Sequence, residues 1–226
     1  MSVEITFLGH SGFMLSAGKH CLTIDPFLTD NPVARHKPAE IKCGHILLSH
    51  GHFDHFGDTV EIARRNNATV IAAYEVTEVA QKHGVKKVEA MNPGGRIGTD
   101  FGWVALTPAF HSSSYQGQYT GMPCGLVINI GGVTLYHTGD TALFSDMKLI
   151  GEIYKPDLAM ICAGDRYTMG PELATRAAEF IGARSAIPIH WGTWPALAQE
   201  AEVRDKFRPS GVEARIMKPG DVWKFG

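Results

Sequence analysis

The chain has 226 residues, of which 44% are hydrophobic and 19% are charged, a composition typical of a folded globular protein rather than a disordered one. Its 21 lysines and arginines are balanced by 23 aspartates and glutamates, which gives a formal net charge of -2. Because there is no basic surplus to attract a polyanion, nucleic acid is not the expected partner.

The chain shows no feature of a secreted or membrane protein. Its first residues lack the basic segment and apolar run of a signal peptide, and no run reaches the about 18 apolar residues that a membrane helix needs. The cysteines are far apart, form no Cys-x-x-Cys pair and lie among apolar residues, as expected of buried reduced thiols; they are Cys21, Cys43, Cys124 and Cys162. We therefore expect a cytoplasmic protein that does not associate with a membrane.

In the first half of the chain, short apolar runs typical of strands alternate with helical stretches. The opening predicts three strands joined by glycine turns, and two further strands follow; the ranges are 3–8, 14–15, 21–24, 46–49 and 69–73. Asp58 and Glu61 have the spacing of a capping box, which predicts a helix from there to about residue 66. A second helix is expected over residues 75–83, ended by Gly84.

The second half repeats this plan loosely. Strands are predicted over residues 104–107, 125–130, 133–137, 158–162, 186–189, 212–217 and 222–225. Helices are predicted over residues 144–153, 171–181 and 195–207, with Pro171 at a first helical position, where proline is favoured. Two such halves, about 1–108 and 109–226, predict one α/β domain over 1–226, a sandwich of two sheets with helices on both outer faces.

The most informative segment follows the predicted strand over residues 46–49. It places three histidines and an aspartate within six residues, namely His50, His52, Asp54 and His55. Neutral imidazole nitrogens and a carboxylate are ligands of Zn²⁺ and similar divalent ions. Packed together without a cation, these side chains would leave several polar groups without partners. The segment therefore predicts a metal site.

Three further candidate ligands each follow an apolar strand: His111, Asp140 and His190. The point where a strand gives way to a loop is where open sheets place ligand-binding groups. A single histidine after a strand is more often a hydrogen-bonded structural residue. The prediction of a metal site therefore depends on the seven residues taken together.

The order His50-x-His52-x-Asp54-His55, then His111, Asp140 and His190, resembles the full ligand set of the metallo-β-lactamase superfamily of binuclear hydrolases. Five shorter segments resemble a bacterial and archaeal group of metal-dependent hydrolases that is similar to the ascorbate-phosphate lactonases: LGHSGF (8–13), IDPF (24–27), TPAFHSSS (107–114), HTGDTALFSDM (137–147) and GDRYTMGP (164–171). The resemblance covers nearly the whole chain and implies an αβ/βα four-layer sandwich.

The resemblance also implies two divalent metal ions, with zinc the first expectation and manganese, iron or nickel as alternatives. One ion would be held by His50, His52 and His111, the other by Asp54, His55 and His190, and Asp140 would bridge them. Residues i and i+2 of an extended segment point the same way, which agrees with one ion shared by His50 and His52. Some β-lactamases of the superfamily place a cysteine at the position of Asp140, so a narrow antibiotic-hydrolysing role is disfavoured.

Two residues near the amino terminus have roles that the sequence leaves open. The resemblance places His10 beside the metals, as a structural residue, a further ligand or a proton donor to the leaving group. Asp25 is expected to orient a ligand histidine, with a turn or capping role as the alternative. The remaining histidines match no motif position and are expected to be surface or packed residues; they are His20, His36, His45, His83 and His137.

Two segments are candidates for substrate contact. Ser112 and Tyr119 follow a predicted metal ligand, and Arg166 and Tyr167 belong to the GDRY segment. The guanidinium of Arg166 suits a carboxylate or phosphate, and an ion pair with Asp165 is the alternative.

The predicted activity is hydrolysis of a small ester, lactone or phosphodiester by a metal-activated hydroxide, with Asp54, Asp140 and His10 as catalytic residues. The expected partner is a small-molecule substrate, and homo-oligomerisation stays open. The sequence shows neither the long basic arm of transfer-RNA 3′-processing enzymes nor the flavodoxin domain of flavodiiron proteins. The alternatives are a metal-binding sensor or interaction module without catalysis, and a nuclease of the same superfamily.

Overall fold

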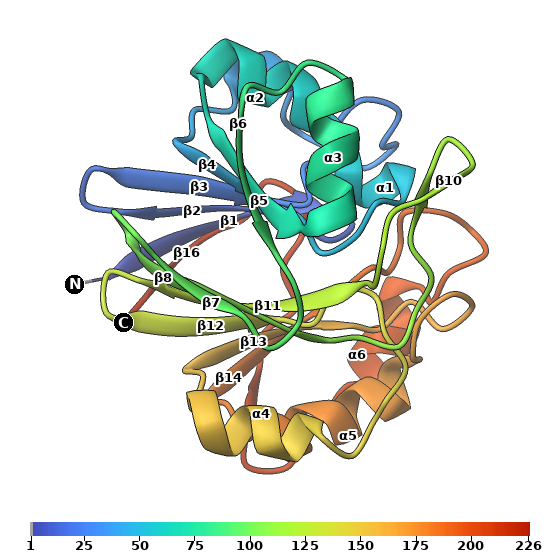
Figure 1. Ribbon diagram of the computed structural model, residues 1–226. Helices are drawn as coiled ribbons and strands as arrows, with labels where there is room; N and C mark the ends of the chain where they lie inside the picture. Colours follow the sequence, from blue (N-terminus) through green and yellow to red (C-terminus); the bar gives the residue numbers. More distant parts are fainter. Residues whose placement is uncertain (1) are drawn as a thin grey trace.

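The protein, described over residues 2–226 by a computed structural model, is built from two mixed seven-stranded sheets that pack face to face, with helices on both outer sides. Figure 1 shows α2 (Thr59–Asn66) and α3 (Tyr74–Lys82) over the first sheet and α4 (Met147–Tyr154) and α5 (Pro171–Ile181) over the second. This arrangement confirms the predicted four-layer αβ/βα sandwich.

The first sheet has the strand order β16-β1-β2-β3-β4-β5-β6. These strands are β16 (Val222–Phe225), β1 (Val3–Gly9), β2 (Gly12–Ala17), β3 (His20–Ile24), β4 (His45–Leu47), β5 (Thr69–Ala73) and β6 (Lys87–Met91). Pairing is antiparallel from β16 to β3 and parallel from β3 to β6. The covering helix α3 buries Val76, Val79 and Ala80, which recur at the helical spacing of three or four residues.

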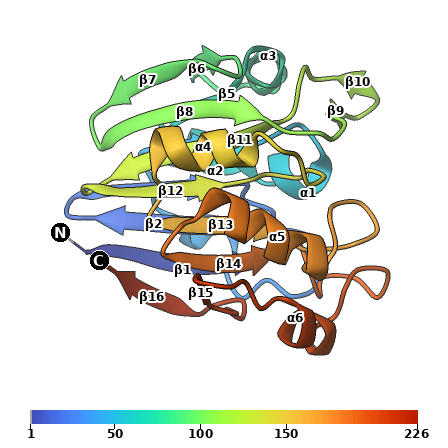
Figure 2. The same cartoon turned by 90° about the horizontal axis from the view of Figure 1, so that it is seen from below.

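The second sheet has the order β15-β14-β13-β12-β11-β8-β7. Its strands are β15 (Glu213–Ala214), β14 (Ser185–Ile189), β13 (Leu158–Cys162), β12 (Val133–His137), β11 (Cys124–Ile130), β8 (Gly102–Pro108) and β7 (Arg96–Thr99). A small hairpin of β9 (Ser114–Tyr115) and β10 (Gln118–Tyr119) stands apart from both sheets (Figure 2). The short elements are α1 (Phe53–Phe56), α6 (Glu200–Lys206) and one turn of 3-10 helix at Pro38–Glu40.

The chain passes from one sheet to the other between β6 and β7, earlier than the boundary expected near residue 108. Strand β8 therefore pairs in the second sheet, and β16 returns to the first sheet to pair with β1. One continuous apolar core fills the space between the sheets; its fully buried side chains include Ile5, Leu15, Leu126 and Ile128. Burying each such side chain contributes roughly 1.5–3 kcal/mol.

The strand directions bring the functional loops to one edge of the sandwich. In the first sheet β1, β3 and β4 run the same way, because β3 is parallel to β4 and β1 is related to β3 through two antiparallel pairings. In the second sheet β8 and β12 run the same way because both are antiparallel to β11, and β14 shares their direction because β12, β13 and β14 are parallel. The loops that carry the candidate ligands all follow the carboxyl ends of these strands, where sheets with parallel strands bind their ligands.

Two predicted elements near the carboxyl terminus are shorter than expected. The helix expected over residues 195–207 is confined to Glu200–Lys206, because the preceding loop forms other backbone hydrogen bonds, from Ala198 N to Gly164 O and from Gly192 N to Ala198 O. The strand expected over 212–217 is reduced to Glu213–Ala214. Conversely, β6 and β7 were not predicted, since both are largely exposed edge strands with little apolar pattern.

The predicted capping box is wrong, although α2 begins where it was expected. The Asp58 carboxylate accepts hydrogen bonds from the backbone N–H groups of Leu28 and Thr29 at 2.8 and 2.9 Å, and Glu61 pairs instead with Arg65 at 3.1 Å. Asp58 therefore fixes the loop after β3 rather than the end of its own helix.

No helix within residues 2–226 combines the length and apolar character needed to cross a bilayer.

Candidate metal centre

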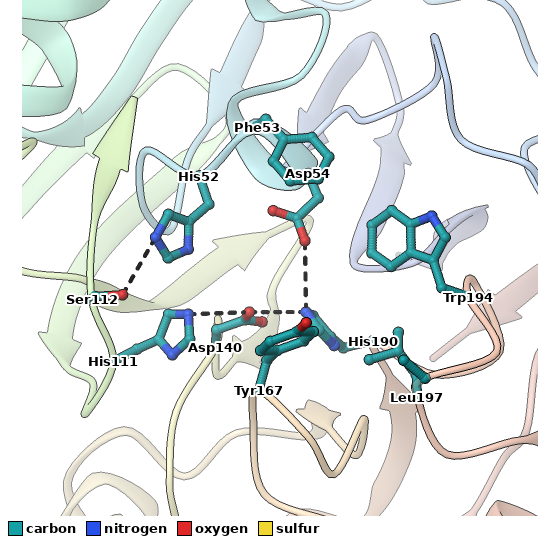
Figure 3. A pocket seen from close by; sticks show the side chains of 11 residues that line it. His52, Phe53, Asp54, His111, Ser112, Asp140, Tyr167, His190, Trp194 and Leu197 are labelled. Carbon is teal, nitrogen blue, oxygen red and sulfur yellow. Dashed lines mark hydrogen bonds and ion pairs between the residues drawn. The ribbon is translucent and has the colours of Figure 1, made fainter. Parts of the chain in front are cut away.

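The seven candidate ligands lie together at the edge where the carboxyl ends of the strands meet. Figure 3 shows those that also line the cavity, which are His52, Asp54, His111, Asp140 and His190. His50 and His52 come from the loop between β4 and α1, Asp54 and His55 from α1 itself, and the other three follow β8, β12 and β14. Their donor atoms form three overlapping groups, each within 4.8 Å: His50, His52 and His111; His50, His55 and Asp140; and His10, Asp54, His55 and His190. Residues 140 positions apart in sequence thus share one site.

The first group is made of imidazoles alone. His50 Nε2 lies 2.9 Å from His52 Nδ1, and the His111 ring centroid lies 5.2 and 5.1 Å from those of His50 and His52. Burial lowers the pKa of all three histidines, and that of His50 falls well below its usual value. Neutral rings at neutral pH present the unprotonated nitrogens that a divalent cation requires.

Asp140 lies at the centre of the cluster. Its Oδ2 is 2.9 Å from His190 Nε2, 3.3 Å from His55 Nε2 and 3.6 Å from His111 Nε2. Burial acts to raise the pKa of Asp140, but the neighbouring His190 and His55 hold it well below its usual value, so the carboxylate is ionised.

Two buried atoms at this point, Asp140 Oδ1 and His55 Nε2, have no hydrogen-bond partner within residues 2–226. A buried charge without a partner is costly. Burial acts to lower the pKa of His55, but the negative charges of Asp140 and Asp25 raise it well above its usual value. The same negative charges would equally stabilise a metal cation bound in place of the proton. The residues present therefore fit a divalent metal.

A hydrogen-bonded chain behind the cluster sets the orientation of two histidines. Asp25 accepts hydrogen bonds from Ser49 N (2.8 Å), Ser49 Oγ (2.6 Å) and His55 Nδ1 (2.7 Å). Because the Ser49 hydroxyl donates to Asp25, its oxygen is left to accept from His50 Nδ1 at 3.0 Å. Both rings then direct an unprotonated Nε2 into the cluster. Asp25 thus contacts a candidate ligand histidine, as expected, and Ser49 is a participant that the sequence did not single out.

Asp25→Asn should weaken metal binding by roughly 10–100-fold, because the amide cannot accept from both Ser49 and His55 Nδ1 as the carboxylate does. Metal affinity measured by competition with a chromophoric chelator tests this. Asp157→Asn is the matched control, since within residues 2–226 the Asp157 carboxylate accepts only from the backbone N–H of Thr134 in the second sheet. Equal affinities for the Asp25 variant and the natural protein would contradict the orienting role.

His10 follows β1 of the first sheet and belongs to the third group, with Asp54, His55 and His190. Its Nδ1 lies 2.8 Å from Thr193 Oγ1 and its Nε2 lies 3.1 Å from Asp54 Oδ2. Burial, followed by the nearby His190, lowers the pKa of His10 to about 4. His10 and His190 both have positive φ angles, 57° and 64°, and the His190 N–H donates to the His10 carbonyl at 2.7 Å. Such strained backbone is typical of functional sites, and here it joins the two sheets.

The loop that carries Asp140 is held by a histidine that was expected only to be a surface or packed residue. His137 is fully buried, its Nε2 donates to the carbonyl of Ser11 at 2.9 Å, and its Nδ1 accepts from the Gly139 N–H at 3.1 Å. Gly139 has a φ of 60°, and a Cβ there would lie 2.6 Å from the Cys124 carbonyl oxygen. Glycine is therefore required for the chain to turn sharply into Asp140.

The cluster opens into a cavity of about 530 Å³ (Figure 3). Ser112 and Tyr167 line it, as their expected contact with substrate requires. Tyr119 does not; it is 70% exposed and lines a neighbouring groove beside Met122. Arg166 is also outside the lining, and its guanidinium lies 5.6 Å from the ring centroid of Tyr167. Within residues 2–226, Arg166 forms no ion pair, so the alternative of a pair with Asp165 is wrong, while its contact with substrate stays a prediction.

The apolar side of this cavity is formed by residues that the sequence did not predict to be functional: Phe53, Trp194, Ala196 and Leu197. A signal was present for Phe53, which stands between two candidate ligands in the metal loop. Leu197 falls in the segment that was expected to be helical and Trp194 directly precedes it, and the loop that forms there instead directs both side chains to the site.

Comparison with known proteins finds relatives over nearly the whole chain. Residues 20–191 match the family described as the Beta-lactamase superfamily domain. The chain is 46% identical to a UPF0173 metal-dependent hydrolase of Thermus thermophilus over 225 residues, covering 99% of both chains. It is 42% identical to another of Archaeoglobus fulgidus over 231 residues, again covering 99% of both.

Among solved structures, the fold is similar to that of Igni18, described as a novel metallo hydrolase from Ignicoccus hospitalis. The TM-score is 0.90 at 32% identity, covering 100% of this chain and 99% of the other. The chain therefore belongs to the metallo-β-lactamase superfamily and, within it, to the UPF0173 family of metal-dependent hydrolases.

Proposed function

We propose that this protein is a binuclear metal-dependent hydrolase that acts on a small ester, lactone or phosphodiester. One observation carries the proposal: Asp140 Oδ2 lies within 3.6 Å of imidazole nitrogens from His55, His111 and His190, while Asp140 Oδ1 has no partner within residues 2–226. A carboxylate placed between His111 of the first group and His190 of the third suits a bridge between two cations, as it would offset their mutual repulsion.

In this proposal His50, His52 and His111 hold one divalent ion, and Asp54, His55 and His190 hold the second. Zinc is the first expectation, and manganese, iron and nickel suit the same donor set. Divalent ions in such a site lower the pKa of water towards neutrality and polarise the scissile oxygen. The protein's own contribution is to fix the ligand nitrogens, through Asp25 and Ser49, and to keep one side of the site open to the cavity.

The contacts of His10 favour a positioning role over that of a proton donor. Both ring nitrogens are occupied, one by Thr193 Oγ1 and the other by Asp54 Oδ2, and His10 is absent from the cavity lining. A general acid must reach the leaving group, directly or through one water molecule. Asp140, which does line the cavity, is better placed to exchange a proton there.

The open cavity also favours catalysis over metal storage or sensing. A structural metal site is closed by its ligands, whereas His52, Asp54, His111, Asp140 and His190 all face the cavity.

Metal analysis together with a panel of ester, lactone, thioester and phosphodiester substrates tests the proposal. We expect two divalent ions per chain and turnover in at least one class. Two bound ions with no turnover of any class would instead identify a metal-binding module.

A further inference from the structure

We propose that the site prefers an uncharged ester or lactone with an apolar acyl part, and that Trp194 and Phe53 determine this specificity. The inference rests on the proposed hydrolytic function and concerns only which substrates it accepts. Its basis is the contrast between the two sides of the cavity: the candidate metal ligands form one, and apolar side chains form the other.

The apolar side is held in place by aromatic contacts. The Trp194 ring centroid lies 6.1 Å from that of Phe53 and 5.9 Å from that of the buried Phe27, and Phe27 and Phe53 meet edge-on at 5.8 Å. The Trp194 ring also meets His10 edge-on at 5.0 Å. Such aromatic contacts add stability beyond that gained from area burial. Through His10 they also connect the apolar side of the cavity to the candidate metal centre.

The cavity also contains apolar side-chain surface that folding leaves exposed to solvent. Phe53 is 64% exposed and Tyr167 is 57% exposed, although both line the cavity. A bound acyl group would remove this surface from water, which is favourable in proportion to the apolar area covered. The cavity, at about 530 Å³, has the size typical of small-molecule sites.

The charges around the cavity argue against an anionic substrate. Within residues 2–226 no lysine or arginine lines it, and its ionised side chains other than histidine are the carboxylates of Asp54 and Asp140. Phosphate and carboxylate groups are normally held by the fork of an arginine, a lysine or the N–H groups of a helix terminus. Arg166 is the basic residue closest in sequence to a residue that lines the cavity. Its guanidinium does not line the cavity and lies 5.6 Å from the ring centroid of Tyr167. A phosphodiester would have only the metal ions to bind its charge, whereas a neutral ester needs no further cation.

The experiment compares substrates that share one leaving group. The metal-loaded protein is assayed with p-nitrophenyl acetate, butyrate and hexanoate and with bis-p-nitrophenyl phosphate. We expect kcat/KM to rise with acyl length, by up to about fourfold for each buried methylene. We also expect the rate enhancement, which is the catalysed rate divided by the uncatalysed rate of the same substrate, to be larger for every ester than for the phosphodiester.

Trp194→Ala should flatten the dependence on acyl length, lowering kcat/KM for the hexanoate by about tenfold or more and for the acetate by much less. Trp194→Phe should restore most of the dependence. Phe53→Ala should act in the same direction, and it removes a side chain whose exposure makes it dispensable for folding. Leu149→Ala on α4 is the control, because that side chain is 51% exposed and does not line the cavity.

A phosphodiester preferred over all esters, or a dependence on acyl length unchanged in both aromatic variants, would overturn the specificity while leaving the hydrolase intact. No turnover of any substrate by fully loaded protein would overturn the proposed function as well. The two failures are therefore distinguishable.

Discussion

Asp140→Asn should lower kcat/KM by at least about 100-fold and reduce the metal content below that of the natural protein. Loss of a partner that merely orients a ligand already costs roughly 10–100-fold in metal affinity. Asp140 contacts three imidazole nitrogens directly, so its loss should cost more. The asparagine keeps the shape of the side chain but removes the negative charge that would offset the two proposed cations.

Elemental analysis of the purified variant, alongside steady-state kinetics, measures both effects. Asp146→Asn is the matched control, because it is the same isosteric substitution at an exposed aspartate six residues later. Retention of two ions and full turnover by the Asp140 variant would exclude a bridging carboxylate.

Removing the metal with a chelator should abolish turnover and lower the melting temperature of the protein. Without a cation, the buried Asp140 Oδ1 and His55 Nε2 have no partner within residues 2–226, and the folded state bears that cost. A ligand present at a thousand times its dissociation constant stabilises the folded state by about 4 kcal/mol. Differential scanning calorimetry before and after chelation measures this difference.

Stepwise addition of zinc, manganese, iron(II) or nickel to the chelated protein should restore both properties together, and the metal that restores turnover best identifies the active form. In Asp140→Asn the same chelation should shift the melting temperature less, because less metal is bound at the start. Full turnover in protein shown to be free of metal would refute the proposed chemistry.

The sequence by itself determined the layers of the fold and the types of side chain at the site. Alternating apolar runs predicted most strands, since burial on a sheet imposes a local period that can be read along the chain. The capping box shows where such local rules stop. Asp58 and Glu61 have the right spacing, but Asp58 instead binds the backbone of Leu28 and Thr29, a partner that only the folded chain supplies.

Strand order and the surroundings of the site were decided by the tertiary structure alone. His137 binds the carbonyl of Ser11, and His10 binds the hydroxyl of Thr193, residues more than 100 positions apart in each pair. Trp194 lines the cavity from a loop that is held by the hydrogen bond from Ala198 N to the Gly164 carbonyl, where a helix was expected to begin at residue 195. Residue type and spacing are properties of a short segment, whereas these contacts arise from the way two sheets bring distant loops to the same edge.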